Sequence, residues 1–254
     1  MSATGQLPLL ALNAVSKVFG GIQALTDISL EVSPHEIVGI IGPNGAGKTT
    51  TFNVITGAYR ASRGEVLLDG TPITAEPSHR IARAGIARTF QNIRLFADMT
   101  VWEHLLVAQP HSAFPLRRLL PMRWGSPEAL RRAKEVLEFF DLGDVRDRIA
   151  RSLPYGIQRK VEMARAVTAR PKLLLLDEPV AGMNHDEANT IRKLMLKLRD
   201  TGLSILLIEH DMAFVMNLCD RLYVLDFGVM IASGLPAEIR ANPAVLDAYL
   251  GAAA

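Results

Sequence analysis

GPNGAGKTT, residues Gly42–Thr50, is the most informative stretch of this sequence. It matches GxxxxGK(S/T), the spacing of a phosphate-binding loop. The preceding run EIVGII, Glu36–Ile41, is rich in β-branched residues and predicts a short buried strand. The following TTFNVITG, Thr50–Gly57, predicts a helix that ends at its glycine. This order of strand, loop and helix is the context that the motif requires, so an anion site is favoured over an ordinary glycine-rich turn beside a lysine.

The chemistry of such a loop follows from its residue types. Glycines let the backbone curl so that successive N–H groups face one anion at the positive end of the helix. We expect Lys48 to reach the β- and γ-phosphates of a nucleotide and the Thr49 hydroxyl to take one Mg²⁺ position. The candidate nucleotide-binding residues of the loop are Gly42, Pro43, Asn44, Gly45, Ala46, Gly47, Lys48, Thr49 and Thr50.

Composition narrows the function classes. A chain of 254 residues allows one large or two small domains, and its formal net charge of +2 does not call for nucleic acid as a partner. The single cysteine, Cys219, cannot form an internal disulfide and favours a reducing compartment. The N-terminus lacks the pattern of a secretory signal, and no window reaches the ~18–20 apolar residues of a membrane span. We therefore expect a soluble chain whose membrane role, if any, comes through a partner.

Strand patterns alternate with helix patterns in much of the chain. Runs at 9–19 and 24–32 around Gly20-Gly21, with a further hairpin-like strand at 64–70, predict antiparallel strands. Buried strands are predicted at 86–91, 172–179 and 203–211, and helices at 77–85 and 187–202. Two more strands within 221–234 and two short helices within 236–251 complete the pattern. The alternation indicates an α/β fold with a mainly parallel core sheet.

Residues 92–170 have a helical pattern instead. Helices are predicted at 99–108 behind Thr100, at 126–143 behind Ser126 and within 153–171, while four prolines in 110–127 favour a loop or a broken helix. This region reads as a helical subdomain inserted into the α/β core. Its dense basic residues fit either a solvated face or a surface near anionic lipid or an acidic partner. They are Arg117, Arg118, Arg123, Arg131, Arg132 and Lys134.

Polar residues stand where predicted core strands end, and in open parallel sheets ligands bind at that edge. Asp177, after four leucines, fits the acid that holds Mg²⁺, directly or through water, in phosphate-loop ATPases. Glu178 is placed to polarise an attacking water. His210 fits a hydrogen-bond donor to the γ-phosphate. Gln91 suits a metal ligand or a water contact. Helix capping is the alternative role for the acids and the histidine.

These residues together resemble the ATP-binding subunit of an ABC transporter over nearly the whole chain. In the terms of that family, Phe19 is the aromatic that stacks on adenine, although its local sequence equally fits a buried strand-end residue. Gly42–Thr50 is the Walker A loop and Gln91 the Q-loop. LLLLDEP is Walker B with Glu178 as catalytic glutamate, and His210 is the switch histidine. LPYGIQ, 153–158, with Gly156, takes the place of the LSGGQ signature.

The resemblance implies a P-loop NTPase fold of the ABC ATPase type that binds ATP and Mg²⁺, with Thr49, Gln91 and Asp177 on the metal. It implies a single domain, 1–254, with an N-terminal antiparallel β subdomain. Segments 1–91 and 171–234 would form the RecA-like core and that subdomain, 92–170 the helical subdomain, and 235–254 C-terminal helices.

The sequence departs from the family pattern in the signature loop. Pro154 replaces the serine and Tyr155 the first glycine, so neither a hydroxyl nor a backbone N–H is offered at Pro154. AGMN, Ala181–Asn184, replaces the usual SALD. These changes imply a specialised branch in which two composite ATP sites need not be equivalent.

The loop LxYGxQR, the run EHDM (Glu209–Met212) and the tail Asn242–Gly251 resemble one branch in particular, the larger ATPase subunit of branched-chain (hydrophobic) amino acid importers. That resemblance implies a second, different ATPase subunit, with a homodimer possible in isolation. It also implies integral membrane permease subunits, a periplasmic binding protein, and a peripheral place on the cytoplasmic face of the inner membrane. Alternatives are importers of amides, urea or aromatic acids, a non-transport ABC ATPase acting on DNA or ribosomes, and a non-hydrolysing binding module.

Overall fold

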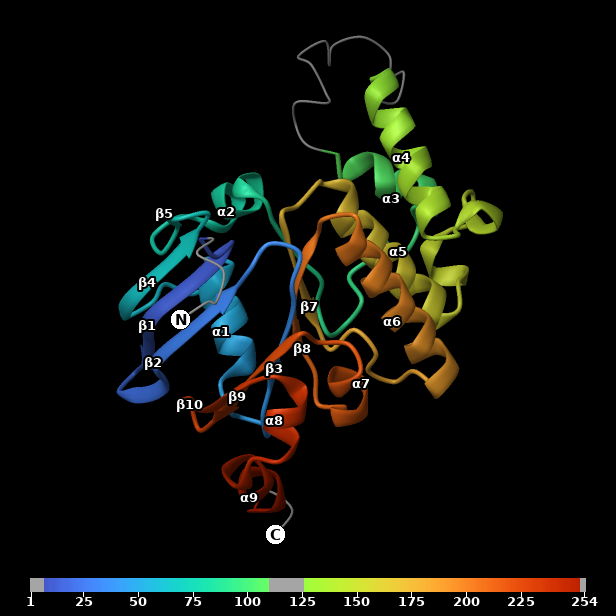
Figure 1. Ribbon diagram of the computed structural model, residues 1–254. Helices are drawn as coiled ribbons and strands as arrows, with labels where there is room; N and C mark the ends of the chain where they lie inside the picture. The colour runs from blue at the N-terminus through green and yellow to red at the C-terminus, as the bar shows by residue number, and fades with distance from the viewer. Residues whose placement is uncertain (1–6, 110–125, 252–254) are drawn as a thin grey trace.

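Two β-sheets and the helices packed on them make up the part of the chain that the structure, a computed structural model, describes: residues 7–109 and 126–251 (Figure 1). The expected loop or broken helix at 110–127 therefore lies almost wholly outside the described residues, as do Arg117, Arg118 and Arg123.

The N-terminal sheet is antiparallel, as expected. Its strand order is β2 (Ile22–Val32), β1 (Leu10–Phe19), β4 (Arg63–Leu68) and β5 (Thr71–Pro72). The β1–β2 turn uses Gly20 and Gly21, both with positive φ, a conformation that glycine adopts without steric cost.

The core sheet has six strands in the order β10, β9, β3, β8, β7, β6. Five are parallel: β9 (Arg221–Asp226), β3 (Ile37–Ile41), β8 (Ser204–Ile208), β7 (Leu173–Asp177) and β6 (Ile86–Arg88). Strand β10 (Val229–Gly234) pairs antiparallel with β9. One prediction was wrong: β6 ends at Arg88, so Gln91 lies in the connection that follows rather than at the strand's last position. The ladder continues for one bond, from Thr89 N–H to the Leu175 carbonyl, before the chain leaves the sheet.

Both faces of the core sheet are covered, which is why β3, β7 and β8 are buried at every position. Alternate residues such as Val38 and Ile40 join the N-terminal sheet, α1 (Lys48–Ile55) and α2 (Ser78–Ala84) in one hydrophobic cluster. Their neighbours Ile37 and Ile41 join a second cluster with helices of the opposite face. Those helices are α3 (Val101–Val107), α4 (Pro127–Phe139), α5 (Tyr155–Thr168), α6 (His185–Asp200), α7 (Met212–Met216), α8 (Pro236–Arg240) and α9 (Pro243–Gly251). In Figure 1, α1 lies between the N-terminal sheet and the core strands, with α4 to α6 on the far side.

Helix starts carry the caps that the sequence predicts. The Thr100 hydroxyl accepts from Glu103 N–H, and the Glu103 carboxylate accepts from Thr100 N–H, which completes a capping box. Ser126 caps α4 through Ala129 N–H. Each such cap contributes about 1 kcal/mol to helix stability.

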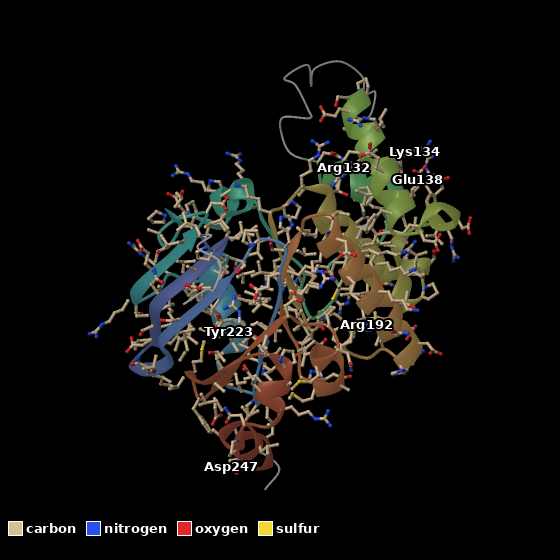
Figure 2. The ribbon with its side chains drawn as sticks, viewed as in Figure 1. Arg132, Lys134, Glu138, Arg192, Tyr223 and Asp247 are labelled. Carbon is tan, nitrogen blue, oxygen red and sulfur yellow. The ribbon has the colours of Figure 1, made fainter. Side chains whose placement is uncertain are left out.

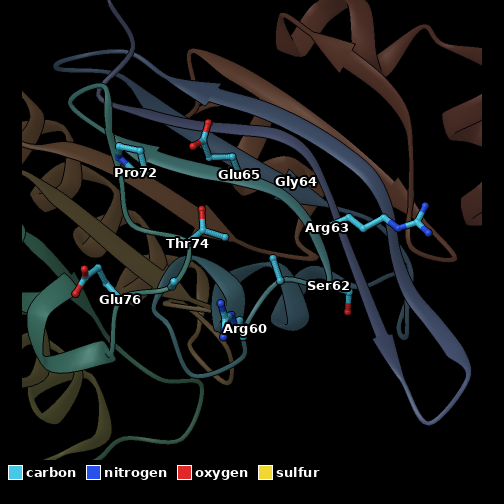
Figure 3. Close-up of a pocket in the computed structure, with 10 residues that line it drawn as sticks. Arg60, Ser62, Arg63, Gly64, Glu65, Pro72, Thr74 and Glu76 are labelled. Carbon is cyan, nitrogen blue, oxygen red and sulfur yellow. The ribbon is translucent and has the colours of Figure 1, made fainter.

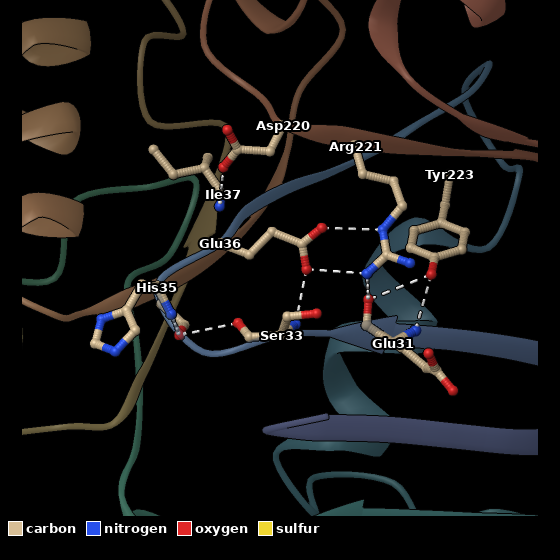
Figure 4. A network of polar contacts seen from close by, with 9 residues as sticks. Glu31, Ser33, His35, Glu36, Ile37, Asp220, Arg221 and Tyr223 are labelled. Atoms are coloured by element: carbon tan, nitrogen blue, oxygen red, sulfur yellow. Dashed lines mark hydrogen bonds and ion pairs between the residues drawn. The ribbon is translucent and has the colours of Figure 1, made fainter. Parts of the chain in front are cut away.

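A polar network fastens the two sheets together (Figure 4). Arg221 of β9 donates to both carboxylate oxygens of Glu36, at 3.0 and 2.9 Å, and to the Glu31 carbonyl at 3.1 Å. The Tyr223 hydroxyl accepts from Glu31 N–H at 3.0 Å. Since Glu31 belongs to β2 and Arg221 to β9, this network fixes the N-terminal sheet against the core.

The basic run of the helical region is paired with acids where the structure describes it. Arg131 contacts Glu135 at 3.0 Å and Lys134 contacts Glu138 at 3.7 Å, both four residues apart on α4. Figure 2 shows Lys134 and Glu138 projecting from this helix. Exposed pairs of this kind contribute little to stability, and they support the solvated-face interpretation for Arg131 and Lys134. Arg132 is instead partly buried and donates to the Val167 carbonyl at 3.2 Å.

Within the described ranges, no helix combines the length and the apolar character needed to cross a bilayer.

The single cysteine, Cys219, is buried beside Gly39. A Cβ added to Gly39 would come within 3.0 Å of the Cys219 sulfur. Burial raises the pKa of this thiol far above its ordinary value.

Candidate functional site

The loop between β3 and α1 has the shape of an anion cradle. Gly42, Gly45 and Gly47 all have positive φ. A Cβ at Gly42 would lie 2.0 Å from the Leu225 carbonyl oxygen, so only glycine fits there. Gly47 caps α1, whose first-turn N–H groups lack intrahelical acceptors and face the loop. The loop therefore presents a row of backbone donors at a helix N-terminus, where a phosphate binds well.

Lys48 is buried and folds back over this loop. Its ammonium donates to the carbonyls of Gly42 at 2.7 Å and Pro43 at 2.8 Å. Burial lowers the pKa of Lys48, and the nearby carboxylates of Glu178 and Asp177 act in the opposite direction. This cation thus lies against the loop and near the two acids at the carboxyl end of β7, where it could neutralise the outer phosphates of a nucleotide.

Three predicted strand-end side chains meet at Glu178. Gln91 Nε2 donates to Glu178 Oε2 at 2.8 Å, and His210 Nδ1 lies 3.8 Å from the same oxygen. The Glu178 backbone has φ 46°, a left-handed conformation that costs a non-glycine residue about 1–3 kcal/mol and is common at functional sites. Its N–H donates to the Ile208 carbonyl at 2.9 Å, which holds the carboxylate at the edge of the sheet.

Arg88, which the sequence reading missed, holds Asp177 in place. Its Nη2 donates to Asp177 Oδ2 at 2.8 Å, and its Nη1 donates to Asn53 Oδ1 of α1 at 2.7 Å. The side chains of Arg88 and Asp177 are each only 8% exposed. A single arginine within an otherwise apolar short strand was the available signal.

Glu209, also missed, is a fully buried carboxylate beside His210. Oε1 accepts from Val180 N–H and Oε2 from His210 N–H, both at 3.1 Å. Burial raises the pKa of Glu209, and these backbone donors act in the opposite direction. The residue ties the chain after Glu178 to the chain that carries His210. An acid directly after a run of buried apolar residues was the signal.

Phe19 lies at the end of β1 with its ring 39% exposed. It meets Tyr59 edge to face at 5.1 Å between ring centroids, and Lys17 Nζ lies 4.6 Å from the Phe19 centroid. The alternative of a buried strand-end aromatic does not hold, because a core ring would not be exposed to this degree. A partly exposed aromatic ring at a strand end can stack on a planar group.

Gly156 is the predicted site residue that the structure leaves apart. It lies in the first turn of α5 beside α6, and a Cβ there would lie 3.2 Å from Glu187 Oε1. A groove of about 180 Å³ runs between these helices and includes Pro154 and Gly156 in its lining. Among the described residues, no hydrogen bond or ion pair joins 153–158 to the phosphate loop.

A larger open cavity of about 400 Å³ lies elsewhere, against β4 and β5 (Figure 3). Arg60 and Arg63 line it together with Glu65 and Glu76, so both charge signs are present. None of the candidate site residues contributes to it. The phosphate-binding geometry is carried by the backbone of Gly42–Thr50 and not by this cavity.

The chain is similar to transport ATPases along almost its whole length. Residues 25–181 match the ABC transporter family, and residues 229–254 match the branched-chain amino acid ATP-binding cassette transporter family. It is 45% identical to the high-affinity branched-chain amino acid transport ATP-binding protein LivG of Escherichia coli K12, over 97% of this chain and 99% of that protein. BraF of Pseudomonas aeruginosa, named for the same transport, is 43% identical over the same shares.

Solved structures agree in fold. An ATP-binding cassette of an ABC transporter in its ADP conformation superposes with a TM-score of 0.86 and 34% identity, covering 97% of this chain and all of that one. A nucleotide-free cassette gives 0.84 and 33%, covering 96% and 99%. The predicted α/β fold of the P-loop type is confirmed. The chain belongs to the ABC transporter family and is an ATP-binding, ATP-hydrolysing subunit of that family.

Proposed function

We propose that this chain is the ATPase subunit of an importer that takes up branched-chain or other hydrophobic amino acids. ATP hydrolysis is supported by one observation: Gln91 and His210 both approach the Glu178 carboxylate, near Lys48 and the phosphate loop. The amino acid class rests on the matched C-terminal segment, 229–254, and on the relatives named for that transport.

Hydrolysis requires in-line attack of water on the γ-phosphate. Glu178 is proposed to orient that water, because its carboxylate lies at the open edge of the sheet and is 19% exposed. Lys48 and His210 stabilise the charge that develops on the phosphate oxygens. Gln91 moves together with the segment after β6 and orients the Glu178 carboxylate through the hydrogen bond between them. Phe19, which packs against Tyr59, stacks on the adenine base of the nucleotide.

The donor set around the acids fits Mg²⁺. The Thr49 hydroxyl is exposed at the start of α1, and Asp177 and Gln91 offer further oxygens. Mg²⁺ prefers oxygen ligands and binds through one or two protein groups together with substrate phosphates and water. Bound there, the ion would neutralise charge on the β- and γ-phosphates.

The proposed assembly pairs this chain with a second ATPase subunit and with membrane permease subunits at the cytoplasmic face of the membrane, and indirectly with a periplasmic binding protein. Pro154 and Tyr155 support a partner of different sequence, since Pro154 offers no donor to a phosphate held by the opposite subunit. The helical region 92–170 is proposed as the subdomain that carries this loop, inserted into a core formed by 1–91 and 171–234, with 235–254 as C-terminal helices.

Purification from membranes tests the assembly, and uptake tests the cargo. The tagged chain should bring integral membrane subunits and a second ATPase from detergent extracts, and a ribosome or DNA partner would contradict the transport function. In proteoliposomes containing the complex and its binding protein, leucine should be taken up with ATP, and unlabelled isoleucine or valine should compete. Competition by urea or an aliphatic amide alone would reassign the cargo.

A further inference from the structure

The connection that carries Gln91 is anchored by helix side chains and not by the core sheet. In this connection, residues 90–96, Arg159 of α5 donates through Nη1 to the Phe90 carbonyl at 2.8 Å and through Nη2 to the Gln91 carbonyl at 2.7 Å. A planar guanidinium is suited to such a two-point grip because its donors have fixed directions.

Two more groups hold the same connection. Glu162 Oε1 accepts from Arg94 N–H at 3.1 Å, and His104 Nε2 of α3 accepts from Phe96 N–H at 2.9 Å. The backbone of the connection is therefore fixed at several points to the helical side of the molecule, while the Gln91 side chain reaches Glu178 after β7.

Arg159 and Glu162, both on α5, also bind each other. Arg159 Nη1 also donates to Glu162 Oε2 at 2.8 Å, and both side chains are fully buried. A buried ion pair is seldom a net source of stability, because desolvation offsets the attraction. Its two-sided contact with 90–94 instead suggests a role in placing that segment.

Tyr155 adds a third side chain to this pair. Arg159 Nη2 donates to the Tyr155 hydroxyl at 3.0 Å, one helical turn away on α5. Tyr155 occupies the place of the first signature glycine, so the altered loop LPYGIQ supplies a group that glycine lacks. The substitution adds a contact within this chain to the side chain that grips the Gln91 backbone.

We propose that Tyr155, Arg159 and Glu162 are positioning residues for ATP hydrolysis: they fasten residues 90–96 to α5 and thereby set where the Gln91 amide meets Glu178. The kinetic part of this inference rests on the proposed catalytic roles, and the anchoring part does not.

Hydrogen exchange tests the anchoring in the full chain without nucleotide. Tyr155→Phe removes one hydroxyl and should speed exchange of the amides in 90–96 about fivefold, the effect of one lost hydrogen bond. Tyr223→Phe makes the same change in the network at Glu31 and should leave those amides unaltered. Equal exchange in Tyr155→Phe and the parent would overturn the anchoring.

Kinetics of the assembled transporter test the positioning. Tyr155→Phe should lower kcat about three- to tenfold and leave KM for ATP unchanged, because the phosphate loop is untouched. In a Gln91→Ala background the same substitution should have no further effect on kcat. An equal loss of kcat in both backgrounds would show that Tyr155 does not act through Gln91. A parent complex without ATPase activity would refute the proposed function, while the exchange result would still decide the anchoring.

Discussion

At the residue scale, Glu178 carries the sharpest prediction. Glu178→Gln keeps the size of the side chain and removes the charge that we propose orients water, so kcat should fall by at least ~10²-fold while ATP still binds. Turnover in the assembled complex and binding of labelled ATP to the same preparation measure the two effects. Turnover at the parent rate would show that another group orients the water.

Glu209 gives a pH-dependent prediction at the same scale. Burial raises the pKa of Glu209 above its ordinary 4.5, so folding favours the protonated form. Its contribution to the free energy of unfolding is complete below pH 4.5 and is lost as pH rises through the raised value. Because Glu209→Gln does not titrate, the free energy of unfolding of the parent should fall relative to that of the variant as pH rises above 4.5.

Urea unfolding at several pH values measures that gain. Glu138→Gln makes the same change on the exposed face of α4 and is the matched control. If the parent-minus-variant difference stays flat with pH, the backbone donors at Val180 and His210 cancel the effect of burial, and if it rises they outweigh burial; either result would contradict the prediction.

At the element scale, Arg88 joins β6, β7 and α1 through its contacts with Asp177 and Asn53. Arg88→Met would leave the Asp177 carboxylate buried and unpaired, which costs about 3–5 kcal/mol of unfolding free energy. Arg131→Met breaks an exposed pair on α4 and should cost about 0–1 kcal/mol. Denaturant unfolding compares the two variants, and a loss below 1 kcal/mol for Arg88→Met would contradict this role.

The elements themselves were largely predictable because their patterns are local. β-forming residues on either side of Gly20-Gly21 mark the first antiparallel strands, apolar runs mark β7 and β8, and Thr100 and Ser126 mark helix starts. The early end of β6 was not predictable, since the backbone that follows it is held by Arg159 of α5, far away in sequence. The same reason hid Arg159 and Glu209: their partners, at 90–91 and at 180, are set by tertiary packing. The motif residues were found because phosphate chemistry fixes their types and spacing.

At the scale of the whole molecule, nucleotide binding should stabilise the fold. Ligand at 100 times its Kd contributes about 2.7 kcal/mol to the free energy of unfolding, which corresponds to a rise in Tm of roughly 5–11 °C for a chain of this size. Lys48→Ala should lose most of this shift, because it removes the ammonium beside the loop that we propose binds the phosphates. Thermal unfolding with and without ATP measures it, with Lys134→Ala on α4 as control. A full shift in Lys48→Ala would argue against the phosphate-loop assignment.

The position of Cys219 has a practical consequence. It is the only cysteine of the chain, and its thiol is shielded in the core beside Gly39 with a raised pKa. Thiolate is the form that reacts with maleimides and disulfide reagents, so we expect the folded chain to show almost no background labelling. A cysteine introduced at an exposed position, such as Phe227 in the β9–β10 turn, would then be the one reactive thiol on the folded protein. Fluorescent pairs or spin labels could follow the approach of two such chains without any change to the native core.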